Sequence, residues 1–154
     1  MKFLETPGAI KKFRRTSWKF QVTFQTPLQA LEPFVSAILG QEPAIERGIL
    51  TVHDVVFEPK KLQALIPSGG DSLAVGKDSC FEAESRTEVE KLLNAAFGEW
   101  VDFLFVPTPK PFVIYADHDE YTTFFFNTKS GISQLTETLV KSGVRQVHEY
   151  QRTL

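Results

Sequence analysis

The sequence predicts an α+β fold, with a mainly antiparallel sheet of about five to seven strands and about three helices packed on one face. Two observations support this fold class. Apolar runs with strand character outnumber the helical patterns, and most neighbouring runs are joined by short connections, which makes the strands antiparallel. A β-α-β pattern begins the chain and another ends it. These two patterns predict pieces of a ferredoxin-like topology.

The stretch Phe112–Phe126 is predicted to form a hairpin at the centre of the sheet. Its two arms, Phe112–Tyr115 and Tyr121–Phe126, are rich in the aromatic and β-branched residues that suit strands. The segment Ala116–Glu120 between them carries four ionisable side chains in a row, which are costly to bury and should face water. We therefore expect two strands and a charged turn.

Both faces of this hairpin carry apolar side chains. Phe112 and Ile114 point to one face, and Val113 and Tyr115 point to the other. A strand that is apolar on both sides is usually covered on both sides. We expect helices on one face, and loops, the N-terminal segment or a second subunit on the other.

The chain begins with a basic segment, residues 1–15, which we interpret as a solvated lead-in to the first strand. Its Lys and Arg residues cluster in the sequence KKFRR at positions 11–15. A contact with an anion or with nucleic acid is the alternative, but the net charge of −2 does not favour it. In residues Ser17–Gln25, apolar and polar side chains alternate, which predicts a half-buried strand near an edge of the sheet.

A helix is predicted between Thr26 and Gly40, where Leu28 and later apolar residues keep helical spacing. Pro33 either kinks this helix or begins its main part. A strand over Ile49–Phe57 follows, with a bulge or turn where His53 and Asp54 interrupt the apolar run. One or two helical turns are expected within residues 59–66.

Residues 68–72 are predicted to form a turn, because their glycines match neither common phosphate-loop spacing. Short strands are expected over Ser72–Val75 and Ser79–Ala83. The sequence SRTE at positions 85–88 is a capping box. It predicts a helix that ends at Gly98.

The remaining chain predicts a strand, the hairpin, a helix and a last strand. Trp100–Val106 is too close to Phe112 for a crossover, so these strands should be antiparallel neighbours. The third helix follows the capping residues 127–130 and should end at Gly143. Its apolar stripe consists of Ile132, Leu135, Leu139 and Val140. Alternation over Val144–Tyr150 predicts the last strand.

Length and composition indicate one globular domain over residues 1–154. The chain has 14 Phe and 42% hydrophobic residues, which provides for a thick core or an aromatic pocket. Cys80 is the single cysteine, so no internal disulfide can form, and we expect a cytoplasmic location. We expect no nucleic-acid partner, no membrane association and no cofactor, because neither the charge nor any motif indicates one.

The candidate site is the turn that contains Asp117, His118, Asp119 and Glu120. Carboxylates and imidazole can bind a metal ion or transfer protons, but neighbours in a tight turn rarely converge on one metal. A metal site would need His53, Asp54 or His148 as well. The turn is otherwise a solvated connection, or a projection that binds a basic protein surface.

A pocket is the second candidate. Trp18, Trp100 and the Phe-rich strands could line it, with Trp100, Tyr115 and Tyr121 at the rim. The same side chains could equally form an ordinary core. Cys80 has acidic residues and no histidine nearby in sequence, which favours a passive thiol over a nucleophile.

Two functions from different classes follow. The first is a non-enzymatic protein-interaction module of the inhibitor or immunity type, which binds its partner through Asp117–Glu120. The second is a small-ligand-binding domain or hydrolytic enzyme with an aromatic pocket near His118. A homodimer formed through the doubly apolar sheet is a third possibility.

Overall fold

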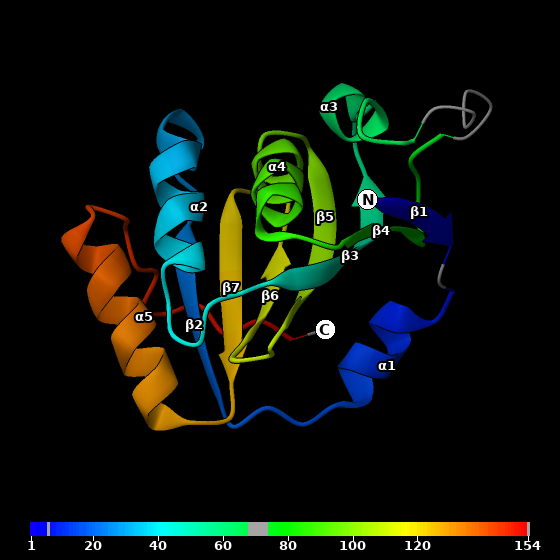
Figure 1. Ribbon diagram of the computed structural model, residues 1–154. Helices are drawn as coiled ribbons and strands as arrows, with labels where there is room; N and C mark the ends of the chain where they lie inside the picture. Colours follow the sequence, from blue (N-terminus) through cyan, green and yellow to red (C-terminus); the bar gives the residue numbers. More distant parts are fainter. Residues whose placement is uncertain (6, 68–73, 154) are drawn as a thin grey trace.

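The computed structural model describes residues 1–5, 7–67 and 74–153 (Figure 1). Its centre is a seven-stranded antiparallel sheet with the strand order β1-β4-β3-β5-β6-β7-β2. The strands are β1 (Lys2–Glu5), β2 (Phe20–Gln25), β3 (Arg47–Val55), β4 (Ser79–Ala83), β5 (Val101–Thr108), β6 (Val113–Ala116) and β7 (Tyr121–Phe126). The helices are α1 (Ala9–Arg15), α2 (Leu31–Leu39), α3 (Lys60–Gln63), α4 (Arg86–Phe97) and α5 (Lys129–Lys141). The predicted α+β class is confirmed.

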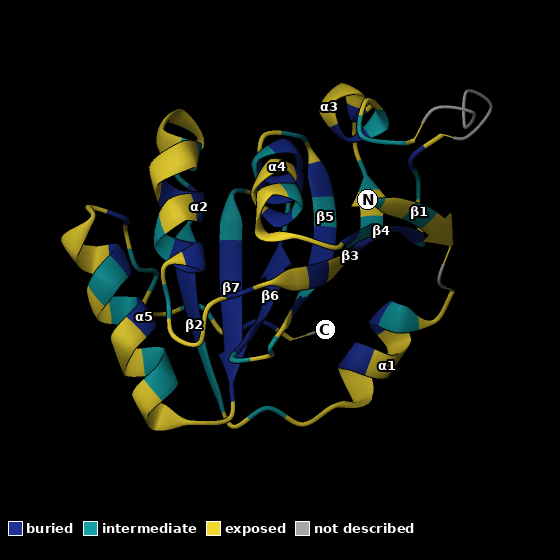
Figure 2. Cartoon of the chain, viewed as in Figure 1, coloured by how far each residue is buried: buried dark blue, intermediate teal, exposed yellow. Residues whose placement is uncertain are grey.

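The two faces of the sheet are covered differently. Helices α2, α4 and α5 pack on one face and bury the larger apolar core, which includes Phe24, Phe103 and Phe124 (Figure 2). On the second face, Ile10 and Phe13 of α1 form a smaller core with strand residues. The two sets of strand side chains alternate along β6 and β7, because successive residues of a strand point to opposite faces.

The predicted central hairpin is present. β6 and β7 pair antiparallel in the register Ile114 with Phe124, and both are interior strands. β5 is the antiparallel neighbour of β6, as expected, and β2 lies at an edge. The turn at residues 117–120 lies at the same end of the sheet as the loop that enters β5 (Figure 1).

β3 contains the predicted irregularity. Its pairing with β5 shifts register between Val52 and Asp54, so His53 occupies a bulge. β4 and β5 pair with the two sides of β3, and α4 connects them. This β4-α4-β5 unit is a split β-α-β arrangement, the part of a ferredoxin-like topology that the structure contains.

Most of the predicted helix caps are present. The Ser85 hydroxyl accepts a hydrogen bond from the Glu88 amide and begins α4. The Glu88 carboxylate, however, accepts from the Glu84 amide rather than from Ser85, and it also pairs with the N-terminal amine. Gly143 follows α5 with a φ of 86°, a left-handed conformation that glycine adopts without strain.

Pro33 does not kink a helix. Residues Leu28–Ala30 form a separate 3₁₀ turn, and α2 begins at Leu31. Pro33 therefore lies in the first turn of α2, where its missing N–H would have no intrahelical partner. In α5, Val140 is 50% exposed and does not belong to the buried stripe.

The basic lead-in is not an unstructured approach to a strand. Residues 2–5 form β1, which pairs with β4, and residues 9–15 form α1. Ile10 and Phe13, three residues apart on one face of α1, pack on the sheet and order this segment. The prediction missed the helix because a stretch of Lys and Arg dominates its composition.

The predicted last strand over Val144–Tyr150 is wrong. Gln146 makes an isolated bridge with Phe24, and the chain then leaves the edge of β2. It crosses the second face, where the ring centroids of Tyr150 and Tyr121 lie 4.9 Å apart. The turn predicted at 68–72 lies outside the described residues. Of the strand expected at 72–75, Ala74 and Val75 are described and are not in a strand.

Candidate functional site

The carboxylate of Asp117 shapes the turn between β6 and β7. Its Oδ1 accepts hydrogen bonds from the amides of Asp119 and Tyr121, both at 3.0 Å. Its Oδ2 lies 2.8 Å from Nη2 of Arg152, in an ion pair whose side chains are 12% and 6% exposed. The expectation that the whole turn faces water is therefore wrong for Asp117, whose charge is neutralised inside the protein.

The other residues of the turn are more accessible. The Asp119 side chain is 75% exposed, and His118 and Glu120 are partly exposed. Glu120 has a φ of 69°, in the left-handed region that usually holds glycine. We call residues Asp117–Glu120 the acidic turn.

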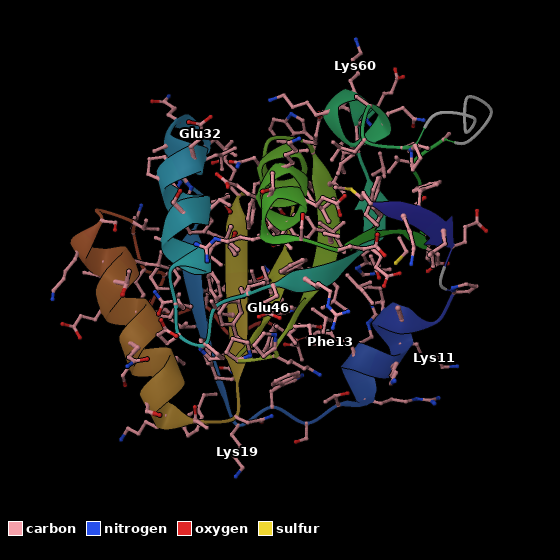
Figure 3. All side chains as sticks on the ribbon, in the orientation of Figure 1. Lys11, Phe13, Lys19, Glu32, Glu46 and Lys60 are labelled. Atoms are coloured by element: carbon pink, nitrogen blue, oxygen red, sulfur yellow. The ribbon has the colours of Figure 1, made fainter. Side chains whose placement is uncertain are left out.

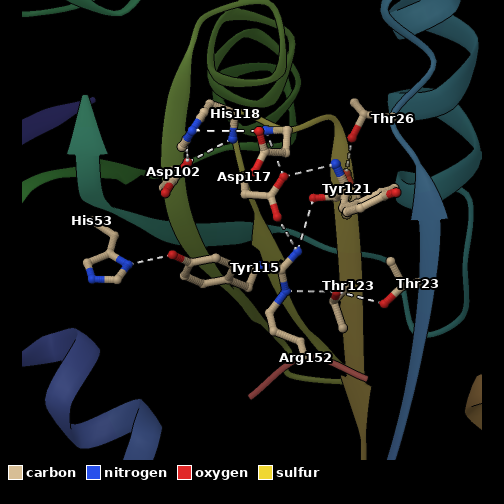
Figure 4. A network of polar contacts seen from close by, with 12 residues as sticks. Thr23, Thr26, His53, Asp102, Tyr115, Asp117, His118, Tyr121, Thr123 and Arg152 are labelled. Atoms are coloured by element: carbon tan, nitrogen blue, oxygen red, sulfur yellow. Dashed lines mark hydrogen bonds and ion pairs between the residues drawn. The ribbon is translucent and has the colours of Figure 1, made fainter. Parts of the chain in front are cut away.

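His118 is oriented by Asp102 at the start of β5. The Asp102 carboxylate accepts hydrogen bonds from the His118 amide and from Nδ1 of its ring, each at 2.7 Å (Figure 4). These bonds favour the imidazolium form and raise the pKa of His118, although partial burial opposes the shift. Nε2 is left pointing toward Asp119, whose nearest oxygen is 3.8 Å away.

A small cavity of about 60 Å³ lies beside His118. Three of the predicted turn residues line it, namely Asp117, His118 and Glu120, together with Trp100. Of the three aromatic residues predicted at a pocket rim, Trp100 is the one that lines this cavity. Tyr115 and Tyr121 do not line this cavity, because their side chains lie on or near the second face of the sheet.

Exposed apolar side chains gather next to the acidic turn. Phe57 is 63% exposed and Trp100 is 47% exposed, with their ring centroids 6.0 Å apart. The Val56 amide N–H donates a hydrogen bond to the Trp100 carbonyl, and the Val56 side chain is also exposed. Leu28 is exposed as well and lines the same cavity as Trp100. We call Leu28, Val56, Phe57 and Trp100 the rim patch. Phe57 is a candidate site residue that the sequence pattern does not predict, and its position at the end of an apolar run, before Glu58-Pro59, is the one local signal for it.

A second polar network lies on the opposite face and centres on Arg152. Its Nε donates to Thr123 at 2.9 Å, and its guanidinium lies 4.7 Å from the centre of the Tyr115 ring (Figure 4). The Arg152 backbone exchanges two hydrogen bonds with the side chain of Gln21. Arg152 thereby fixes the C-terminal segment on the sheet. Sequence reasoning could not find this role, since no local pattern marks a single Arg near a chain end.

His53 joins the same network from the bulge in β3. Its Nδ1 forms a short hydrogen bond with the Tyr115 hydroxyl, and Nε2 lies 3.5 Å from the Arg14 guanidinium. Burial, followed by the positive charge of Arg14, lowers the pKa of His53. Burial is also the main cause of a strongly raised pKa at Tyr115, so its hydroxyl stays protonated.

The remaining candidates do not converge on one site. His148 and Asp54 are exposed, and Cys80 is a buried free thiol. Trp18 packs on the second face near Phe13 and Phe125, away from Trp100. Within residues 1–5, 7–67 and 74–153, no group of three or more His, Cys, Asp or Glu side chains is placed to hold a metal ion.

Comparison of the chain with protein-family models, with curated proteins and with solved structures found no match. The helices in the described part of the chain are too short or too polar to span a bilayer.

Proposed function

We propose that the protein is a non-enzymatic protein-binding module that engages its partner through the rim patch and the acidic turn. The observation that carries this proposal is the exposure of Phe57 and Trp100 in contact with one another. Large aromatic side chains are enriched in protein interfaces and dominate their binding energy. Two such rings on a surface are costly to leave in water unless they have a partner.

The surroundings of the rim patch define the partner's chemistry. Asp119 is exposed on one side of the patch and Glu58 is exposed beside Phe57. An apolar centre with charged residues around it matches the usual anatomy of an interface. The proposed partner is therefore a protein that offers an apolar pocket bordered by basic residues, as in complexes of the inhibitor or immunity type.

Phe57→Ala and Trp100→Ala variants test the proposal. Each truncation should weaken partner binding by about 2 kcal/mol, roughly thirtyfold, because it removes an aromatic side chain from the centre of the interface. A photo-reactive amino acid at position 57 would first identify the partner in host extract, and titration calorimetry with the purified partner would then give the affinities.

Val140→Ala is the matched control. Val140 is 50% exposed on α5 and is not part of the rim patch. Its truncation should leave the affinity unchanged. Affinities unaffected by Phe57→Ala and Trp100→Ala, or reduced equally by Val140→Ala, would contradict the proposal.

An enzymatic or ligand-binding role near His118 is the alternative, and the Asp102–His118 pair favours it. Asp102 orients the ring through Nδ1, and Nε2, which lies 3.8 Å from the nearest oxygen of Asp119, is the atom that would exchange a proton with a substrate. The cavity of about 60 Å³ is small beside the roughly 300–1,000 Å³ of ligand sites. The same calorimetry separates the two functions. Phe57→Ala should weaken partner binding in the first case but leave ligand binding or turnover unchanged in the second, because Phe57 does not line the cavity, whereas His118→Ala should abolish turnover or ligand binding in the second case.

A further inference from the structure

A second cavity, of about 250 Å³, opens on the other face of the sheet. It lies between α1, the start of β2 and the C-terminal segment. Phe13, Trp18 and Phe125 provide an aromatic wall, and Arg14, Lys19 and Arg152 provide positive charge. It shares no lining residue with the cavity beside His118. We call it the basic cavity.

Within the described residues, the charges of Arg14 and Lys19 in the basic cavity are not balanced. Its described lining contains no Asp or Glu. Arg152 is paired with Asp117, but Arg14 and Lys19 form no ion pair with any residue of the described ranges. A cleft lined by one sign of charge concentrates ions of the opposite sign, although the whole chain has a net charge of −2.

Trp18, one of the lining residues, carries a buried donor that no described group satisfies. The indole Nε1–H of Trp18 is buried and has no hydrogen-bond partner within the described structure. A buried donor without a partner destabilises the folded state. Thr16 contributes a hydroxyl, while the guanidinium of Arg14 and the ammonium of Lys19 can only donate. The side chains of Arg14, Thr16 and Lys19 together suit an anion with several oxygen atoms, and phosphate in particular.

We propose that the basic cavity binds a small organic phosphate. The phosphate group lies between Arg14 and Lys19, and the organic part packs against Phe13 and Trp18. The volume of about 250 Å³ is just below the range of drug-sized ligand sites, which restricts the occupant to a small monoester. This proposal does not depend on the rim patch, because the two sites use different residues.

A fluorescence titration tests the site. Trp100→Phe leaves Trp18 as the sole tryptophan, since the chain has two. In this background, phenyl phosphate should change the Trp18 emission saturably at constant ionic strength. Phenol, which has the same ring without the charge, should bind at least about tenfold more weakly, because it cannot form charge-assisted hydrogen bonds.

Two double variants locate the binding. Arg14→Gln with Lys19→Gln should weaken phenyl phosphate binding by about tenfold or more. Lys11→Gln with Lys12→Gln is the matched control, because it also removes two charges near or on α1. Neither of these side chains lines the cavity, and Lys11 points away from the sheet while Phe13 points toward it (Figure 3). The control should keep the parental affinity. Equal thermal midpoints establish that all variants fold.

Three results would overturn the proposal. The first is no saturable response to phenyl phosphate, and the second is equal binding of phenol. The third is an equal loss of affinity in both double variants, which would indicate diffuse attraction to a basic surface. Tight binding of a single-stranded oligonucleotide, weakened equally by both double variants, together with no binding of phenyl phosphate, would assign the surface to nucleic acid instead.

Discussion

Glu120 is the residue at which the acidic turn departs most from ordinary backbone geometry. Its φ of 69° brings a side chain into a conformation that costs L-residues roughly 1–2 kcal/mol. Its carbonyl accepts a hydrogen bond from the Thr26 amide, which joins the turn to the end of β2. This long-range bond holds the residue in its left-handed conformation.

Replacing Glu120 by Gly should therefore raise the free energy of unfolding by about 0.5–1 kcal/mol. Glycine removes the steric cost of positive φ, and no hydrogen bond of the Glu120 side chain is present in the described structure to be lost. Urea denaturation measures the change.

Asp119→Gly provides the comparison within the same turn. Asp119 has no positive φ, so glycine there increases the freedom of the unfolded chain, removes the contact with His118 and should lower stability. A loss of stability in both variants would show that the conformation of Glu120 carries no strain.

The C-terminal segment, residues 144–153, is the element whose position depends most on a single side chain. Arg152 reaches Thr123 and Asp117 on two different parts of the hairpin, and its guanidinium stacks on Tyr115. The segment therefore covers the second face of the sheet instead of extending the sheet as an eighth strand beside β2.

Breaking the Arg152–Asp117 pair from either side should destabilise the protein by about 3–5 kcal/mol, because each single variant leaves a buried charge without its partner. Asp117→Asn keeps an oxygen for the turn amides, and Arg152→Met keeps much of the volume. The double variant should be more stable than the sum of the single losses predicts, with a coupling of about 1–3 kcal/mol from urea denaturation.

Glu137 and Lys141 supply an internal control for this cycle. They form an ion pair of 2.8 Å on α5, with side chains 66% and 75% exposed. The corresponding cycle should give a coupling below about 0.5 kcal/mol, because solvent screens the pair. Couplings of equal size in the two cycles would mean that Arg152 does not anchor the segment.

The elements that could be predicted are those with local signals. The alternation in 17–25, the capping residue Ser85 and the interrupted run at His53 are all signals between neighbours in sequence. The cap and the bulge are present, and β2 is present from Phe20 rather than from Ser17. The prediction of a last strand over Val144–Tyr150 is wrong because alternation shows only that a strand is compatible with the sequence. Whether the segment pairs with β2 depends on its other contacts, and the contacts of Arg152 draw the segment onto the second face of the sheet instead.

At the scale of the molecule, the acidic turn and the basic residues of α1 are separated. The rim patch and the acidic turn lie at one end of the sheet, while α1 brings Lys11, Lys12, Arg14 and Arg15 to its second face. His118 and His53 belong to these two regions, and their surroundings shift their pKa values in opposite directions.

These shifts give the histidines opposite effects on stability. The pKa of His118 is raised above its ordinary value of 6.5, so its stabilising effect is complete below 6.5 and is lost as pH rises through the folded-state pKa. The pKa of His53 is lowered, so its contribution is complete above 6.5 and is lost as pH falls through the folded-state pKa.

Urea denaturation of His118→Gln and His53→Gln between about pH 5 and pH 8 checks this assignment. Relative to the parent protein, His118→Gln should be most destabilising at the acidic end of the range and His53→Gln at the basic end. If the loss of unfolding free energy changed with pH in the same direction for both variants, the proposed surroundings of one histidine would be contradicted. Imidazole resonances followed by NMR would identify which one.

The sequence by itself determined the class of fold, the central hairpin with its charged turn, and the positions of the β3 bulge and the α4 cap. These features arise from contacts between residues close in the chain, so periodicity and capping chemistry suffice to reveal them. Only the tertiary structure decided that Asp117 is neutralised by Arg152, that Phe57 joins Trp100, and that Arg14 and Lys19 line one cavity. Each of these depends on strands and segments far apart in sequence being brought together by the burial of a common core, and no local pattern encodes that geometry.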